Sequence, residues 1–288
     1  MPSKPNSIRD ALSFDLEDWF HMLDVPSLSD PKEWLTLPTL LERTIVPVLG
    51  RLRSRQVRAT FFVLGWIAAQ YPELICKIAA DGHEIASHAH WHRRLDQLTP
   101  ESLTEELNLA SSAIFQACGV HPRGFRAPSF SITPGSEWIL DALVQAGFSY
   151  DASLFPARRD NGGYACPRGP HFQCTPTGVS LPEFPMSIMN LGPFPLAFSG
   201  GGYLRLLPLP LIHMGFRQAH RQGNPVVVYL HPRDFAPDAP RVAMSLAKRF
   251  KSRVGLSTTW AKFETLLDTY NFTTCAEVLS ERGLLKGP

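Results

Sequence analysis

Short and almost uninterrupted apolar runs alternate along the chain with longer segments in which apolar residues recur every three or four positions. A short run bounded by turn residues is typical of a buried strand, and the longer period is typical of an amphipathic helix. Because the two kinds of segment alternate, the pattern predicts an α/β fold of β/α units around a mainly parallel sheet. The predicted strands are residues 11–15, 59–64, 83–88, 124–126, 148–151 and 226–231.

Helices are predicted between these strands and near the end of the chain. Thr99 and Thr133 each precede a proline, which is the sequence of an N-cap followed by the first helical residue. Gly82, Gly119 and Gly147 stand where predicted helices should stop, because glycine readily adopts the left-handed conformation that ends many helices. The predicted helices are residues 39–53, 67–80, 100–117, 134–146, 258–270 and 276–285.

Residues 156–210 break this alternation, because Pro and Gly recur every few positions and no period holds for long. We therefore expect a loop-rich insertion there, which either rims the site, as such loops do in a barrel enzyme, or is a merely structural excursion. The chain has 288 residues and no clear linker, so we predict a single domain over residues 1–288 with helices at its C-terminal end.

Composition narrows the class of partner. Hydrophobic residues make up 44% of the chain and charged residues 19%, which is typical of a globular protein with a large core. Lys and Arg number 28 against 26 Asp and Glu, so charge gives no reason to expect a nucleic acid partner. The five cysteines include no C-x-x-C pair and indicate neither a disulfide framework nor a thiolate zinc site. No pattern in the sequence indicates an oligomeric state.

The sequence predicts a cytoplasmic protein, since no apolar run of signal-peptide length follows the positive charges near the N-terminus. The longest apolar run, residues 59–69, is shorter than the roughly 18 residues of a spanning helix. Residues 241–253 form a basic stretch that contains no Asp or Glu. A solvated helix face is its simpler explanation, and peripheral membrane contact is the alternative. Its members are Arg241, Lys248, Arg249, Lys251 and Arg253.

Four clusters of charged or imidazole side chains follow predicted strands, where β/α folds gather their active sites. The first is residues 13–20, SFDLEDWF, in which Asp15, Glu17 and Asp18 crowd together. Carboxylates this close repel one another unless a cation or a shared proton relieves them. Taken alone, an acidic surface turn explains this cluster better than a site does.

The second cluster, residues 82–92, contains four imidazoles. A continuing strand would put His88, His90 and His92 on one face, whereas a helical turn would align His88 with His92 and direct His90 away. We favour the turn, because residues 91–94 no longer alternate as a half-buried strand should. With one carboxylate of the first cluster, His88 and His92 predict a metal site with positions open for water and substrate.

The third and fourth clusters each place one side chain at a strand end. Arg126 lies just before Pro128 and can hold a carboxylate through paired hydrogen bonds, although an ordinary ion pair is the alternative. His231 ends a strongly β-forming run and precedes Pro232, which keeps it extended. It is well placed as a general acid, and a buried hydrogen-bonding role is the alternative.

Seven segments, taken in their order along the chain, resemble the polysaccharide deacetylases of carbohydrate esterase family four, which share the nodulation-type deacetylase homology domain. The branch they resemble is linked to exosortase and exopolysaccharide loci. The resemblance implies a distorted (β/α) barrel of about seven strands. It also implies one divalent metal ion, most often zinc, with cobalt, nickel or iron as alternatives. The segments are SFDLEDWF, ATFFVLGWIA, GHEIASHAHWH, GFRAPSFSIT, FSYDASLFP, GGYLRLLP and VVVYLHPRDF.

The implied activity is hydrolysis of N-acetyl groups on a poly- or oligosaccharide during exopolysaccharide biosynthesis, which is hydrolysis of a non-peptide carbon–nitrogen bond. The resemblance makes Asp15 the catalytic base and His231 the catalytic acid. It makes Arg126 the residue that positions the base, with Asp151 supporting Arg126 or His231. It makes His88 and His92 the metal-binding pair.

The first cluster departs from the family pattern, in which two aspartates usually stand side by side. If the strand continues past Asp15, Glu17 returns to the same face and becomes the third ligand, which we favour. If the chain turns at once, Asp18 reaches the metal instead. His90 also departs, since an aromatic residue is commoner at that position.

As a hypothesis for the mechanism, the metal would activate a water, Asp15 would take its proton and His231 would protonate the leaving amine. The backbone N–H after Arg126 would help to hold the oxyanion. Aromatic and apolar residues near the strand ends are candidates for sugar contacts, or they pack the barrel mouth. The candidates are Trp19, Trp91, Pro128, Phe130 and Leu230.

Two other functions fit the same fold. A small-molecule amidohydrolase is one, but some relatives of that kind lack a metal and the histidine pair argues against it. A catalytically inactive carbohydrate-binding relative is the other, and the presence of both Asp15 and His231 argues against it.

Overall fold

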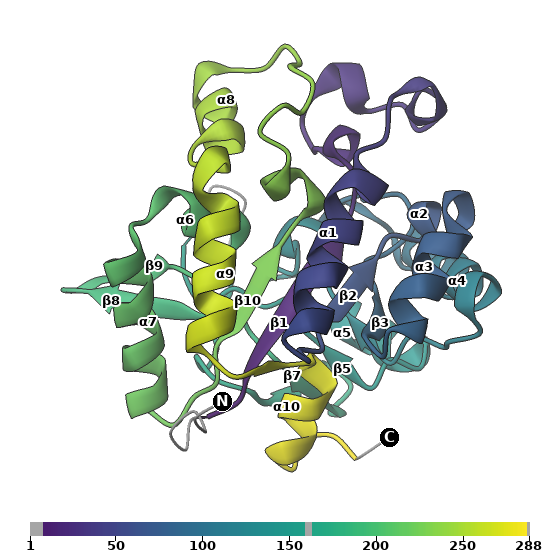
Figure 1. The fold of residues 1–288 in the computed structure, drawn as a ribbon. Coiled ribbons are helices and arrows are strands. Elements are labelled where there is room, and N and C mark those ends of the chain that lie inside the picture. Colours follow the sequence, from purple (N-terminus) through teal and green to yellow (C-terminus); the bar gives the residue numbers. More distant parts are fainter. Residues whose placement is uncertain (1–7, 159–162, 287–288) are drawn as a thin grey trace.

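The computed structural model describes residues 8–158 and 163–286, which form one curved, mostly parallel sheet flanked by helices (Figure 1). The strands are ordered β10 (Val227–Leu230), β1 (Asp10–Leu16), β2 (Thr60–Val63), β3 (Glu84–Ser87), β4 (Gly124–Phe125), β5 (Tyr150–Asp151), β7 (Ser180–Glu183) and β6 (His171–Cys174). A short β11 (Phe272–Thr273) pairs with β1. Among the described strands of this sheet, only β6 runs antiparallel to its neighbour. The path from β10 to β7 is therefore seven parallel strands, which confirms the predicted distorted (β/α) barrel.

Each predicted strand segment overlaps one of these strands, because its apolar residues can be buried on both faces of the sheet. In β2, for example, all four residues are buried. Phe61 packs with the large core cluster under one face, whereas Phe62 packs with a second cluster on the other.

Helices α1 (Leu41–Ser54), α2 (Gly65–Gln70), α3 (Pro72–Ala80), α4 (Pro100–Cys118) and α5 (Trp138–Gln145) lie between the strands, and α9 (Thr259–Thr269) and α10 (Cys275–Glu281) end the chain. The Thr99 side chain caps α4 as predicted, and Gly119 ends that helix at a φ of 72°. The single helix predicted over residues 67–80 is wrong, because the chain breaks at Tyr71 and restarts at Pro72. Thr133 is not a cap, since α5 begins only at Trp138.

Residues 156–210 were expected to be loop-rich, and they contain more regular structure than that. Besides β6 and β7, the segment forms a hairpin of β8 (Ile188–Leu191) and β9 (Phe194–Ala197), followed by α6 (Gly201–Leu206). Two further helices, α7 (Leu209–Arg221) and α8 (Leu246–Arg253), were not predicted. Pro182 and Pro195 lie in strands of the antiparallel pairs, and Pro208 and Pro210 lie at the start of α7, where a missing N–H is tolerated.

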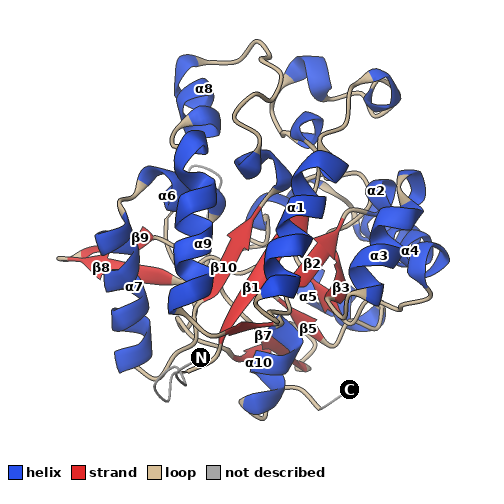
Figure 2. Cartoon of the chain, viewed as in Figure 1, coloured by secondary structure: helices blue, strands red, loops and turns tan. Residues whose placement is uncertain are grey.

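The parallel strands end together at one edge of the sheet, as Figure 2 shows for β1, β2 and β10. Asp15 is in register with Phe62, Ser87 with Phe125, and Phe125 with Asp151. Short 3-10 helices lie at this edge and around it, and they supply several residues of the site. They are η1 (Trp19–His21), η2 (Pro26–Leu28), η3 (Trp34–Thr36), η4 (Leu95–Gln97), η5 (Pro128–Phe130), η6 (Pro232–Phe235) and η7 (Leu256–Thr258).

We propose that residues 1–288 are one domain, because one sheet takes strands from both halves of the chain: β7 pairs with β5, and β10 pairs with β1 at the other edge. Within the part of the chain that the structure describes, no helix has both the length and the apolarity needed to cross a bilayer.

Candidate metal centre and active site

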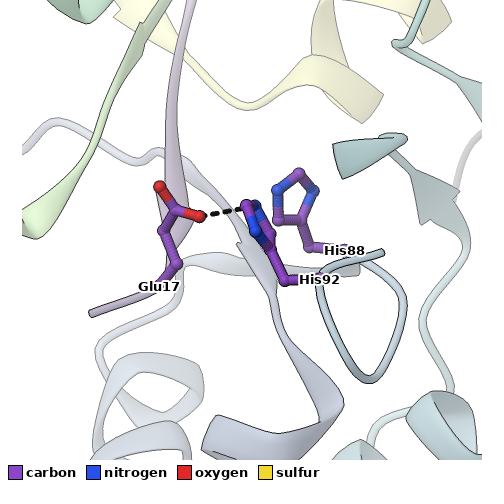
Figure 3. A group of neighbouring side chains, drawn as sticks. All are labelled: Glu17, His88 and His92. Carbon is purple, nitrogen blue, oxygen red and sulfur yellow. Dashed lines mark ion pairs between the residues drawn. The ribbon is translucent and has the colours of Figure 1, made fainter. Parts of the chain in front are cut away.

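Three buried side chains at the carboxyl edge of the sheet could hold a metal ion: Glu17, His88 and His92. One ligand atom from each lies within 4.8 Å of the others. Figure 3 shows the Glu17 carboxylate facing the His92 ring, with the His88 ring beside it. Glu17 follows β1 and the two histidines follow β3, so two neighbouring parallel strands bring the three together.

The chain after β3 does not form the helical turn that we expected. Ala89 and His92 have positive φ angles of 60° and 54°, so a tight irregular loop brings His92 back beside His88. Their ring centroids are 5.3 Å apart. The prediction that these two align while His90 points elsewhere agrees with this geometry. His90 fills the space above Gly65, where a Cβ would lie 2.5 Å from its Nδ1.

The donor set fits a divalent transition metal. Nδ1 of His88 lies 2.8 Å from the carbonyl oxygen of Arg126, so Nδ1–H donates to that oxygen and Nε2 keeps its lone pair for a metal. Burial lowers the pKa of His88 to about 4, which keeps the ring neutral as a ligand must be. Two imidazole nitrogens and one carboxylate oxygen are a common ligand set for zinc, iron or cobalt.

Glu17 provides the negative charge of this group. Its Oε2 lies 2.5 Å from Nε2 of His92, and its carboxylate is almost fully buried. Burial raises the pKa of Glu17, but the charges of His92, His231 and Arg233 outweigh it and bring the pKa well below its usual range. The carboxylate is therefore ionised and ready to bind a cation.

Asp18, the alternative third ligand, is used for the local structure instead. Its Oδ1 accepts from the backbone N–H of Trp19 at 2.8 Å, and its Oδ2 accepts from the Thr39 hydroxyl at 2.6 Å and from the Leu40 N–H at 3.0 Å. It thus caps η1 and ties the segment before α1 to it. Strand β1 continues one residue past Asp15, as the choice of Glu17 required.

Asp15 lies beside this group and is held by a fully buried arginine. Nη1 of Arg126 donates to Oδ1 of Asp15 at 2.6 Å and to the Ser13 hydroxyl at 2.9 Å, and its Nε donates to the Ala152 carbonyl at 3.2 Å. The guanidinium also lies 3.9 Å above the Phe62 ring. The contact with Asp15 is therefore one N–H bond and not the paired bonds that we expected.

His231 faces both carboxylates from β10. Its Nε2 lies 3.8 Å from Asp15 Oδ2 and 3.7 Å from Glu17 Oε1, and its Nδ1 lies 3.1 Å from Asp234 Oδ2. Burial lowers the pKa of His231, but the hydrogen bond and charge of Asp234 outweigh it, so the pKa is raised. A ring that retains its proton to higher pH is suited to donate one.

Sequence reasoning missed Asp234 and Arg205, which stand behind His231. Nε of Arg205 lies 2.9 Å from Asp234 Oδ1, and both side chains are almost fully buried. A Cβ on Gly201 would lie 2.3 Å from Asp234 Oδ2, so glycine is needed for this close approach. The signal was present, because Asp234 follows His231 by three residues, the spacing of a capping contact.

Asp151 does not support Arg126 or His231 directly, contrary to expectation. Its Oδ1 accepts from the Ser153 hydroxyl at 2.5 Å, and its carboxyl group is hydrogen-bonded to the buried Glu183 of β7. Burial raises the pKa of Asp151 to about 6 and that of Glu183 well above its usual range. The N–H after Arg126, that of Ala127, donates to Ser153 at 2.7 Å, so it is already engaged and does not serve an oxyanion.

Of the predicted sugar contacts, four are buried in the protein: Trp19, Pro128, Phe130 and Leu230. Trp19 also donates from its Nε1 to the Pro38 carbonyl. Only Trp91 is partly exposed. It borders a hollow of about 780 Å³ that also reaches His92 and is lined mainly by residues 21–34. Trp91 is thus the one predicted contact that the geometry leaves open to a ligand.

Comparisons with known families cover most of the chain in two parts. Residues 30–150 match the polysaccharide deacetylase family, and residues 152–280 match a domain of unknown function, DUF3473. The first match includes both histidines of the candidate metal centre, and the second includes His231. The sheet passes through both ranges, since β5 pairs with β7.

Among similar proteins is a chitooligosaccharide deacetylase of Bradyrhizobium sp. (strain ANU 289), 44% identical over 82 residues, which are 28% of this chain and 37% of that protein. A peptidoglycan-N-acetylglucosamine deacetylase of Bacillus cereus is 28% identical over 116 residues, 36% of this chain and 42% of that one. The matches thus span less than half the length of these curated relatives.

The fold is shared with a crystal structure described as a putative polysaccharide deacetylase from Mycobacterium smegmatis. Its TM-score is 0.60 at 21% identity, over 96% of this chain and 91% of that one. The Bc1960 peptidoglycan N-acetylglucosamine deacetylase has a TM-score of 0.50 at 16% identity, over 95% and 88%. The comparisons therefore show a polysaccharide deacetylase match over residues 30–150, a DUF3473 match over residues 152–280, and a fold shared with the two solved structures.

Proposed function

We propose that this protein is a metal-dependent hydrolase that removes N-acetyl groups from a poly- or oligosaccharide. The observation that carries the proposal is the buried group of Glu17, His88 and His92, with Asp15 and His231 facing it from neighbouring strands. Deacetylase names among the similar proteins support the same class of reaction.

Glu17 and the two histidines would hold the ion, which when bound supplies Lewis acidity to a carbonyl oxygen and lowers the pKa of a water. Asp15 would take the proton of the attacking water, because Arg126 holds its Oδ1 and leaves Oδ2 directed towards the site. His231 would donate its proton to the amide nitrogen as the C–N bond breaks, giving acetate and a free amine. Asp234 keeps that proton on the ring until it is needed.

Zinc is the metal we propose first, because two nitrogens and one oxygen leave the open position typical of a catalytic zinc site. Cobalt, nickel or iron would suit the same ligands. We propose an exopolysaccharide as the polymer, since the seven sequence segments resemble the deacetylases of exopolysaccharide loci.

Acetate release from a panel of N-acetylated oligosaccharides tests the function directly. We expect release that a chelator stops and that added zinc or cobalt restores. Release that persists in the chelator would favour a small-molecule amidohydrolase if simple amides are also cleaved. Oligosaccharide binding without any release would instead favour an inactive carbohydrate-binding protein.

We also propose peripheral contact of α8 with an anionic membrane surface. Leu246 and Phe250, one turn apart on this helix, are 73% and 59% exposed. Arg249 lies between them in the sequence, and the helix carries no acidic residue. Apolar side chains flanked by basic ones suit the interface of a bilayer with anionic lipids.

Sedimentation with vesicles tests this contact. We expect binding to vesicles with anionic lipid and not to neutral ones, weakened by salt and reduced about tenfold by Leu246→Ser with Phe250→Ser. Phe194→Ala, on the equally exposed tip of the β8–β9 hairpin, should have no effect. Binding that ignores both salt and the double substitution would contradict the proposal.

A further inference from the structure

We propose that the hollow beside His92 binds the sugar unit next to the one that reacts, with Nε2–H of His21 as its buried hydrogen-bond donor. This inference rests on the proposed function and adds a binding site to it. It concerns the segment between β1 and α1, residues 21–34, most of which lies outside the range matched by the polysaccharide deacetylase family.

The hydrogen bonds of His21 fix where its proton lies. Its Nδ1 accepts from the backbone N–H of Asp18 at 2.9 Å, so Nδ1 carries no hydrogen. A neutral imidazole then has its hydrogen on Nε2, which is a donor and cannot ligate a metal. His21 is 2% exposed, and its Nε2 has no hydrogen-bond partner. A buried donor without an acceptor is costly, and a ligand oxygen would relieve that cost.

The walls of the hollow suit a sugar. His21, Trp34 and Trp91 all line it, and Trp91 is the partly exposed ring. Sugar rings present C–H faces that pack on aromatic side chains and hydroxyl oxygens that accept hydrogen bonds. A hollow of about 780 Å³ falls in the range of ordinary ligand sites.

The charges at the rim favour an uncharged unit. Two acids, Asp24 and Asp30, and two bases, Lys32 and Arg93, line the hollow, so their formal charges cancel. Asp24 lies 3.5 Å from Lys248, and Arg93 pairs with the buried Glu106. An N-acetylated or neutral hexose fits this balance better than a phosphorylated or acidic one.

The position of the hollow ties it to the reaction. His92 belongs both to the candidate metal centre and to the lining of the hollow. The His21 and His92 ring centroids are 6.3 Å apart. A chain whose reacting unit sits at the three ligands therefore reaches the hollow with a neighbouring unit.

The two amide substitutions of His21 separate its two hydrogen bonds. His21→Asn puts an oxygen near the place of Nδ1, so it can still accept from Asp18 but has no donor at the place of Nε2. His21→Gln puts an NH₂ group near the place of Nε2 and keeps a donor. Trp91→Ala removes the aromatic wall, and Phe194→Ala is the matched control on an exposed ring elsewhere.

Calorimetric binding of N-acetylated sugars of one and of four or more units to the metal-loaded protein tests the inference. We expect His21→Asn and Trp91→Ala to weaken binding of the longer sugar about three- to tenfold and to leave the single unit unchanged. His21→Gln should weaken it less than His21→Asn, and Phe194→Ala should not weaken it. The metal content of all variants should equal that of the wild type.

The outcomes separate the two proposals. If the wild type binds the longer sugar no better than the single unit, or if His21→Asn and Trp91→Ala change neither, the hollow is not a sugar site. If the variants weaken binding as expected but the wild type releases no acetate with any metal, the hollow stands and the deacetylase function fails.

Discussion

Replacing His88 by alanine is expected to abolish both the bound metal and the activity. His88 offers Nε2 to the centre because its Nδ1–H is fixed on the Arg126 carbonyl, and without it only Glu17 and His92 remain. A Lewis acid contributes several kcal/mol to amide hydrolysis, so its loss should slow acetate release on the order of 10³-fold or more. Elemental analysis of the purified variant, together with the acetate assay, measures both effects.

His90→Ala is the control for this result, since His90 follows the same strand but packs over Gly65. It should retain the metal of the wild type, although the gap that it leaves will lower stability. Full metal occupancy in His88→Ala would contradict the proposed ligands. Loss of the ion in His90→Ala would show that the three histidines act from one face.

The parallel sheet was predictable because its strands are continuous apolar runs, and the same feature placed the clusters at one edge. The apolar side chains of runs such as residues 59–64 and 226–231 are removed from water only if the strand is buried on both faces. The helix over residues 67–80 was predicted too long because the apolar period continues through Pro72, where the backbone breaks. Helix α7 was not predicted, because Pro208 and Pro210 were interpreted as part of a loop. In the structure Pro208 is the N-cap and Pro210 lies in the first turn, where proline is tolerated.

The candidate site could be predicted as a set of residue types, but not as a network. The period of β1 was enough to favour Glu17 over Asp18, because it depends only on alternation along one strand. Glu183 and Arg205 come from residues 156–210, where no period predicted their direction. The contact of Arg205 with Asp234 depends on tertiary structure that the sequence pattern does not reveal. The same packing brings the Nη atoms of Arg205 to the carbonyls of Lys251, Ser252 and Val254.

Buried charge is the common feature of these residues. Arg126 is balanced by Asp15, and Arg205 by Asp234, so the proposed base and the carboxylate that supports His231 each have a buried cation behind them. A buried pair costs desolvation energy, and breaking it costs more because one charge is left alone. The arrangement therefore holds Asp15 and His231 in place while leaving Asp15 Oδ2 and His231 Nε2 to face the substrate.

The His231→Ala variant is expected to bind the metal normally and to lose most of its deacetylase activity. This result would distinguish a general acid from a metal ligand. General acid catalysis is typically worth 10²–10⁴-fold, so acetate release should fall by about that factor at unchanged metal content. The loss should be larger for amide substrates than for an acetyl ester with a good leaving group, because such a group needs no proton to depart. An equal loss on both substrates, or a loss of metal, would show that His231 acts in another way.

The pH profile provides the second measurement for His231. Because Asp234 raises the pKa of His231, the wild-type ring stays protonated above its usual range, and activity should fall only as the pH rises past that value. Asp234→Asn removes the charge that raises this pKa, so the alkaline limb of kcat should move to lower pH. Arg205 keeps its three backbone carbonyl acceptors in this variant. An alkaline limb that stays in place would mean that another group, and not His231, supplies the proton.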